Sequence, residues 1–116
     1  MTGDNRMTAQ KITLLDGAMG TMLQHAGLQL GDRPETLSIT APDVVEHIQR
    51  QYIQAGTRML LANTFCANAH KLAGTGYDVE EVIGASVLNC NMINHKIIAH
   101  KTKNIVYCLR KIICFC

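Results

Sequence analysis

The sequence predicts an α/β fold in which strands and helices alternate along the chain. Two short apolar runs, at residues 11–15 and 59–62, each end at a polar or glycine-containing turn, and a helical pattern follows each of them. Continuous apolar runs of this kind are typical of parallel strands that are covered on both faces. A strand, a helix and a second strand at this spacing predict a right-handed parallel crossover. The order corresponds to about two β/α units, the amino-terminal part of a (β/α)8 TIM barrel.

The residues between the two strands support this order. A short helix is expected over residues 18–26, since Gly27 can adopt the left-handed conformation that closes a helix. Residues 28–40 are predicted to form a loop. The next helix is expected to begin at Pro42, because proline fits the first helical turn, and to end at Gly56. Apolar side chains recur at helical spacing between these two residues.

A similar pattern follows the second strand. Residues 66–73 predict one or two helical turns that end at Gly74. Asp78 and Glu81 then have the spacing of a capping box, in which each residue satisfies a free backbone amide of the other. This motif predicts the start of a further helix, whose apolar face continues to Leu88.

The length and the charge distribution divide the chain into three segments. A complete barrel takes roughly 250 residues, so a chain of 116 residues has room for less than half of one. Residues 1–92 hold nine acidic and six basic side chains, a net charge of −3, whereas residues 93–116 hold five basic and no acidic side chains, a net charge of +5. We therefore expect a flexible amino terminus at residues 1–10 and a partial barrel domain at residues 11–92. The basic segment, rich in Cys, Ile and Lys, is expected to be an unrelated or disordered tail.

The composition favours a cytoplasmic protein that does not cross a membrane. No run approaches the roughly 18 consecutive apolar residues of a membrane helix, and the first ten residues are polar. Five cysteines without a secreted context predict reduced thiols. Cys66 and Cys90 fall in predicted helical stretches, where a buried small residue is the simplest explanation. The CysPheCys sequence at 114–116 has no second pair at the spacing of a zinc site, so the residues themselves predict no metal site.

Two turns are the candidate ligand-binding motifs. The AspGlyAlaMetGlyThr sequence at 16–21 has two glycines that allow a tight turn whose amides point at a carboxylate, while Asp16 can orient an ammonium group. The AsnThrPhe sequence at 63–65 supplies an amide, a hydroxyl and an aromatic ring after the second strand. Each motif follows an apolar strand, at the end where a barrel strand presents backbone amides and short side chains to a ligand. Taken alone, each motif is better explained by a structural role, with Asp16 or Asn63 as a helix cap and Phe65 as a core residue.

Three further segments accompany these motifs: GlyAspArgProGlu at 31–35, AlaProAspValVal at 41–45 and AlaGly at 55–56. Together, the motifs and segments resemble the amino-terminal part of the homocysteine S-methyltransferase family, and most closely its methionine synthase type. The resemblance covers roughly residues 11–92. It implies transfer of a methyl group to the thiol of homocysteine, which forms methionine. For Glu35, in a ProGlu turn of the family's first loop, a structural role is at least as well supported as ligand contact. The substrate-binding residues that the resemblance implies are Asp16, Gly17, Ala18, Asn63, Thr64 and Phe65.

The same resemblance implies a zinc ion in the complete family, held by three cysteines from later segments of the barrel, and cobalamin and folate in methionine synthase types. Those later segments are absent from this sequence. The resemblance therefore implies no cofactor and no catalytic residue in this chain, and a truncated chain that is inactive alone. Its implied partners are homocysteine and a further barrel-containing chain.

Two other functions remain open at this point. The chain could be non-catalytic and bind an amino acid or another barrel fragment through its half of the pocket. The basic residues of 93–116 could instead bind nucleic acid, because Lys and Arg neutralise phosphates. Those bases are interleaved with Ile and Val rather than gathered on one face, so the sequence gives a nucleic-acid partner little support. Whether the chain acts as an enzyme is left open by the sequence.

Overall fold

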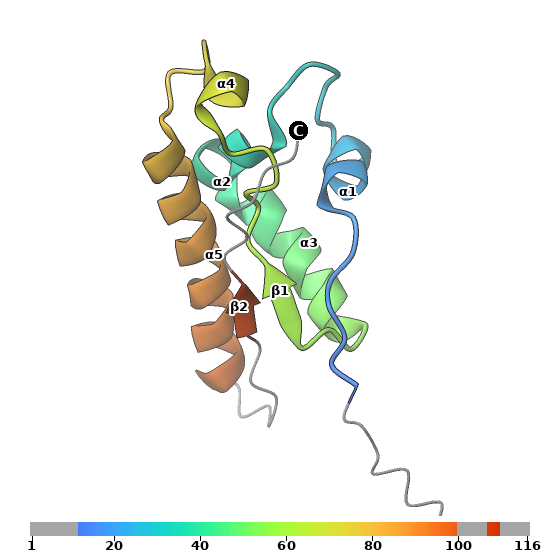
Figure 1. Cartoon of the computed structure of the whole chain (residues 1–116). Coiled ribbons are helices and arrows are strands. Elements are labelled where there is room, and N and C mark those ends of the chain that lie inside the picture. The colour runs from blue at the N-terminus through green and yellow to red at the C-terminus, as the bar shows by residue number, and fades with distance from the viewer. Residues whose placement is uncertain (1–11, 100–106, 110–116) are drawn as a thin grey trace, which may run out of the picture.

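The computed structural model describes residues 12–99 and 107–109, with side chains described for residues 12–93. Figure 1 shows helices on both sides of two short strands. The elements in chain order are α1 (Met19–His25), the 3-10 helix η1 (Pro34–Thr36), α2 (Leu37–Thr40), α3 (Pro42–Gln54), β1 (Met59–Leu61), α4 (Ala69–Leu72), α5 (Val79–Ala99) and β2 (Tyr107–Leu109).

Parallel pairing organises the described residues, as the sequence predicts for an α/β fold. β1 pairs in parallel with β2, with Met59 opposite Tyr107 and Leu61 opposite Leu109. Leu15 adds a single parallel bridge to Met59. The strands of the described ranges form an open two-stranded sheet rather than a closed barrel. The structure is thus an α/β fragment.

The first predicted strand, residues 11–15, is reduced to this one bridge, and residue 11 lies outside the described residues. Met59 N donates a hydrogen bond to Leu14 O at 3.2 Å, and Asp16 N donates to Met59 O at 3.2 Å, so the segment still runs along β1. Its side chains are poorly covered, since Ile12 is 83% and Leu14 is 52% exposed. The prediction assumed a strand buried on both faces, and the described elements do not supply that cover.

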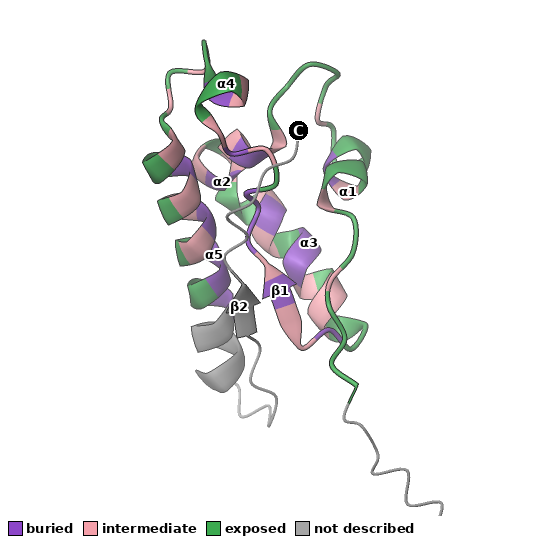
Figure 2. Ribbon diagram, viewed as in Figure 1, coloured by how far each residue is buried: buried purple, intermediate pink, exposed green. Residues whose placement is uncertain are grey.

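Helices α3 and α5 bury the central strand. Leu60 of β1 is fully buried and clusters with Ala62 and with Cys90 and Ile93 of α5, while Tyr52 of α3 packs against the same cluster. In Figure 2 the buried residues of both helices face the strand and the exposed residues face outward. Apolar burial on both sides of one strand is the packing expected of a strand in a parallel α/β sheet.

Two smaller clusters fix the shorter helices. Leu23 of α1 packs with Val45 and Ile48 of α3. Leu72 of α4 packs with Val82 of α5. Helix α1 follows the carboxyl end of the first strand segment, and α4 follows the carboxyl end of β1. These two clusters therefore hold in place the turns beyond both strand ends.

Several predicted helix boundaries are confirmed. Helix α1 is closed by Gly27, at φ +108°, and α3 begins at Pro42 and is closed by Gly56, at φ +111°. Both glycines have the left-handed backbone that side chains disfavour. The capping box before α5 is also formed, since Asp78 N donates to Glu81 Oε2 at 3.2 Å and Glu81 N donates to Asp78 Oδ1 at 2.8 Å.

Two predictions about the course of the chain are wrong. Residues 28–40 are not a simple loop, because they contain η1 and α2, and α2 packs against α3 and α5. The boundary predicted at residue 92 lies inside α5, since residues 85–99 hold no glycine or proline that would stop a helix. β2 lies in the segment predicted to be unrelated to the fold. The other residues of that segment, 100–106 and 110–116, and the predicted flexible start lie outside the described residues.

Within the ranges that the structure describes, no helix combines the length and the apolar character that a membrane span requires, the 21-residue α5 included.

Candidate functional site

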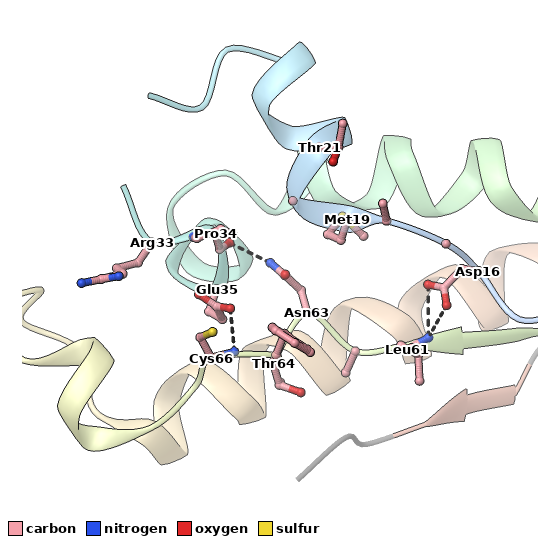
Figure 3. A pocket seen from close by; sticks show the side chains of 15 residues that line it. Asp16, Met19, Thr21, Arg33, Pro34, Glu35, Leu61, Asn63, Thr64 and Cys66 are labelled. Carbon is pink, nitrogen blue, oxygen red and sulfur yellow. Dashed lines mark hydrogen bonds between the residues drawn. The ribbon is translucent and has the colours of Figure 1, made fainter. Parts of the chain in front are cut away.

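A cavity of about 440 Å³ opens at the carboxyl end of β1. Three segments that are far apart in the sequence line it: residues 16–21, 33–35 and 61–66. All six residues singled out from the sequence lie in the first and third of these segments. The structure therefore brings the two predicted motifs to one cavity, and it adds a third wall from the segment that begins at Arg33. Figure 3 shows the three walls around the cavity.

Asp16 links the first wall to the strand. Its Oδ1 and Oδ2 both accept from Leu61 N, each at 3.2 Å (Figure 3). Burial raises the pKa of Asp16 above its usual value, and the hydrogen bond from the Leu61 amide opposes this shift in part. A half-buried carboxylate beside a cavity attracts a cationic group, because a nearby positive charge replaces part of the hydration that the carboxylate has lost.

At Gly17 a side chain is disfavoured by close packing rather than by an unusual backbone angle. A Cβ atom at this position would lie 3.1 Å from the Tyr52 hydroxyl oxygen. That hydroxyl donates to Ala18 O at 2.9 Å, so Tyr52 of α3 ties down the turn. The sequence suggested that glycine serves a tight turn here, and the structure adds the close approach of an aromatic ring as its reason.

Asn63 and Phe65 differ in exposure and in partners. Asn63 is 6% exposed, and its Nδ2 donates to Pro34 O at 2.8 Å and to Ser38 Oγ at 3.3 Å. It does not cap a helix, because the cap of α4 is Asn68, whose side chain accepts from Lys71 N. Phe65 is 55% exposed and is not a core residue. Both structural alternatives left open by the sequence are thereby excluded for the AsnThrPhe motif.

Thr64 and Glu35 form the buried part of the facing walls. Thr64 is 3% exposed and Glu35 is 3% exposed. Glu35 Oε1 accepts from Cys66 N at 2.8 Å, which fastens the loop before η1 to the turn after β1 (Figure 3). Glu35 Oε2 is buried and has no hydrogen-bond partner among the residues that the structure describes. The ProGlu turn thus has a structural role.

The structure describes the side chains of two cysteines, Cys66 and Cys90. Cys66 lies in the turn between β1 and α4 rather than in a helix, and it is disulfide-bonded, which corrects the prediction of a reduced thiol there. Cys90 is a buried thiol on α5, outside any disulfide, and its Sγ accepts from Gln49 Nε2 at 3.3 Å. In the described ranges no three His, Cys, Asp or Glu side chains gather closely enough to hold a metal ion.

Comparison with known proteins assigns the chain to a family. The family model for homocysteine S-methyltransferase matches residues 13–109. The chain belongs to the homocysteine S-methyltransferase family. The match continues beyond residue 92, where the resemblance was expected to stop, and it includes the rest of α5 and β2. The segment predicted to be unrelated is therefore part of the family's sequence pattern at least as far as residue 109.

Curated relatives and solved structures agree with this family. The chain is 42% identical over 81 residues to methionine synthase of Mycobacterium leprae (strain TN) and 41% identical over 81 residues to that of Mycobacterium tuberculosis (strain ATCC 25618 / H37Rv). These alignments cover 65% of this chain and 7% of each relative, so the chain spans a small part of their length.

The solved structures of the homocysteine methyltransferase MmuM from Escherichia coli have the same fold over most of this chain. The metallated form matches with a TM-score of 0.72 and 25% identity, and covers 86% of this chain and 36% of that protein. The oxidized form matches with a TM-score of 0.75 and 23% identity, and covers 90% of this chain and 38% of that protein. The chain corresponds to little more than a third of such a methyltransferase.

Proposed function

We propose that this chain forms the homocysteine-binding part of an S-methyltransferase barrel. The observation that supports the proposal most strongly is that the AspGlyAla and AsnThrPhe turns line the same cavity, at the carboxyl end of β1. The carboxyl end of barrel strands is the face on which barrel enzymes place their active sites. The substrate-binding residues in this proposal are Asp16, Gly17, Ala18, Asn63, Thr64 and Phe65.

The cavity offers complementary charges for the amino-acid portion of homocysteine. Asp16 is a carboxylate at one wall, suited to the ammonium group. Arg33 lines the second wall and is exposed, suited to the carboxylate group. The exposed ring of Phe65 supplies an apolar contact for the methylene groups of the substrate.

The proposal assigns binding to this chain and methyl transfer to the complete barrel. Zinc, which the family implies, would keep the homocysteine sulfur as a thiolate at neutral pH when bound. The described residues do not fit zinc, because Cys66 is disulfide-bonded, Cys90 is buried on α5 and no cluster of ligands is present among them. We therefore expect the chain alone to bind homocysteine without turning it over.

Titration calorimetry with the full chain tests the proposal. L-homocysteine should bind, and 4-mercaptobutyrate, which has the thiol and carboxylate but no ammonium group, should bind at least about tenfold more weakly, the loss expected for a hydrogen bond to a charged group. Both probes carry a thiol, so both can exchange with the Cys66 disulfide.

Asp16→Ala should weaken homocysteine binding by a similar factor, whereas Asp43→Asn, an exposed acid at the start of α3, serves as the matched control and should bind normally. Equal affinity for the two thiols, or an unchanged affinity in Asp16→Ala, would contradict the proposal.

A further inference from the structure

Behind the cavity, buried hydrogen bonds connect Asn63 to α5. Asn63 Nδ2 donates to Ser38 Oγ at 3.3 Å, and the hydroxyl oxygens of Ser38 and Ser86 are 2.8 Å apart. Ser86 Oγ also lies 2.8 Å from Val82 O and 3.1 Å from Asn63 O. Ser38 and Ser86 are 3% and 1% exposed. The AsnThrPhe turn is thus bonded to two hydroxyl groups that water does not reach.

Counting protons gives this chain of bonds a direction. A hydroxyl group has one proton, and the carbonyls of Val82 and Asn63 can only accept. The proton of Ser86 is therefore used on these carbonyls, and the proton between the two hydroxyl groups comes from Ser38. Ser38 Oγ in turn accepts from Asn63 Nδ2. Asn89 Nδ2 donates to Ser38 O at 3.1 Å, which fixes the backbone of α2 against α5 as well.

The same bonds fix which way the Asn63 amide points. The Pro34 carbonyl is only an acceptor, so the nitrogen of Asn63, and not its oxygen, must face it at 2.8 Å. The second proton of Nδ2 goes to Ser38 Oγ. Both amide protons are then used within the protein. Asn63 lines the cavity, and its Oδ1 accepts no hydrogen bond from the described residues, so it is left with accepting capacity.

We propose that Ser38 and Ser86 are positioning residues that fix the orientation of the Asn63 side-chain amide. In this orientation Oδ1 faces the cavity as a hydrogen-bond acceptor and selects a ligand that carries a hydrogen-bond donor. If the proposed function holds, that donor is the ammonium group of homocysteine, and this part of the inference rests on the proposed function. The fixed orientation of the Asn63 amide does not rest on the proposed function, because it follows from hydrogen bonds within the protein. Neither serine was singled out from the sequence.

The locked amide can be measured without any ligand. In the nuclear magnetic resonance spectrum of the full chain, the Asn63 side-chain proton pair, assigned by its loss in Asn63→Asp, should exchange slowly with water. Ser86→Ala should speed this exchange by about tenfold or more, since one lost buried hydrogen bond is worth about that factor. Ser86→Thr, which keeps the hydroxyl, should restore slow exchange. Thr75→Ala removes a hydroxyl bonded to Leu72 O at 2.7 Å outside this network and is the control.

Ser38→Ala provides an independent variant if Ser86→Ala does not fold, because it removes the acceptor of Asn63 Nδ2 while leaving Ser86 its bond to Val82 O. Asn63 exchange in Ser86→Ala and Ser38→Ala that stays within twofold of the parent chain overturns the positioning role, whether or not homocysteine binds.

Binding of L-homocysteine and of 4-mercaptobutyrate tests the proposed link between the Asn63 amide and the ammonium group. The ratio of the two affinities should fall by about fivefold to tenfold in Ser86→Ala and should stay unchanged in Thr75→Ala, a difference that general destabilisation does not produce. An unchanged ratio in a folded Ser86→Ala chain overturns the link to the ammonium group. If the parent chain binds neither thiol, the proposed function fails, while the exchange measurement still decides the positioning role.

Discussion

At the scale of single residues, Asp16 serves both the fold and the cavity. Its two carboxylate oxygens accept from the Leu61 amide, so it joins the first wall of the cavity to β1. The same carboxylate is half-buried, and desolvation raises its pKa. Its ionised form is consequently less favourable in the folded chain than in the unfolded chain. A cationic ligand beside it would reverse that penalty, which makes the residue suited to binding an ammonium group.

This raised pKa predicts how stability changes with pH. A carboxyl group with a raised pKa in the folded chain binds its proton more tightly there, so its contribution to stability is present at acidic pH and is lost as the pH rises through the folded pKa. The unfolding free energy of the parent chain, relative to Asp16→Asn, should therefore increase as the pH is lowered from 7 into the acidic range. Urea unfolding of both chains at several pH values measures this. A difference that shrinks on acidification would contradict it.

The position of the candidate site residues follows from the sequence, but their partners do not. Two apolar runs that end in polar turns are enough to place Asp16 and Asn63 at the same end of neighbouring strand segments. The partners of Asn63 come from segments far away in the sequence, because Ser38 is 25 residues before it and Ser86 is 23 residues after it. A single serine within a helix has no local pattern that marks it as buried. Only the packing of α2 against α5 shows its role.

At the scale of elements, α5 is the helix that holds the fragment together. It packs on β1 through Cys90 and Ile93, and on α4 through Val82. The capping box at Asp78 and Glu81 sets its start, which a sequence pattern can predict because both partners lie within one turn. Its end could not be predicted in the same way, since no glycine or proline marks it.

Ile93 tests whether α5 belongs to the core beyond the predicted boundary. Ile93→Ala should lower the unfolding free energy by about 2 to 5 kcal/mol, as expected for removing a large side chain from a packed core. Leu88→Ala, on the exposed face of the same helix at 58% exposure, should change it by less than about 1 kcal/mol. Denaturant unfolding of the three chains measures both values. Equal effects of the two substitutions would show that Ile93 is not buried as described.

The two elements that the sequence misassigned have physical explanations. The first strand pairs at Leu15 alone, because the pattern of apolar residues reports a tendency to be buried and not whether covering elements exist. The 28–40 segment contains η1 and α2, although the sequence predicts a loop there. Pro34 instead occupies the first position of η1, where a missing backbone amide costs nothing. Proline marks the start of a helix here as much as a break.

At the scale of the whole molecule, the described residues form an α/β fragment with a cavity at the carboxyl end of β1. It matches 36% of a solved homocysteine methyltransferase and 7% of the methionine synthases compared. The described strands leave the sheet open, and Ile12 and Leu14 are largely exposed. Exposed apolar residues and an open sheet edge favour association with another chain.

Truncation tests how much of the chain the fold needs. The sequence predicts that residues 93–116 form an unrelated or disordered tail, whereas α5 continues to Ala99, Ile93 lies in the core and β2 pairs with β1. A chain that ends at residue 92 should therefore lose cooperative unfolding, and a chain that ends at residue 109 should keep it. Thermal unfolding followed by circular dichroism compares the two. Equally cooperative unfolding of both truncated chains would support the predicted domain boundary at residue 92.

The most direct test of the central claim is to complete the barrel. Residues 13–109 should be joined to the later strands of the Escherichia coli homocysteine methyltransferase, and methionine formation from homocysteine should be measured. The chimera should be active, and Asp16→Ala should lower its catalytic efficiency by more than about tenfold, which corresponds to about 1.4 kcal/mol of transition-state stabilisation. Zinc content and cooperative unfolding show that both chimeras are assembled. A folded, zinc-bound chimera in which Asp16→Ala is as active as its parent would contradict the assignment of this cavity to homocysteine.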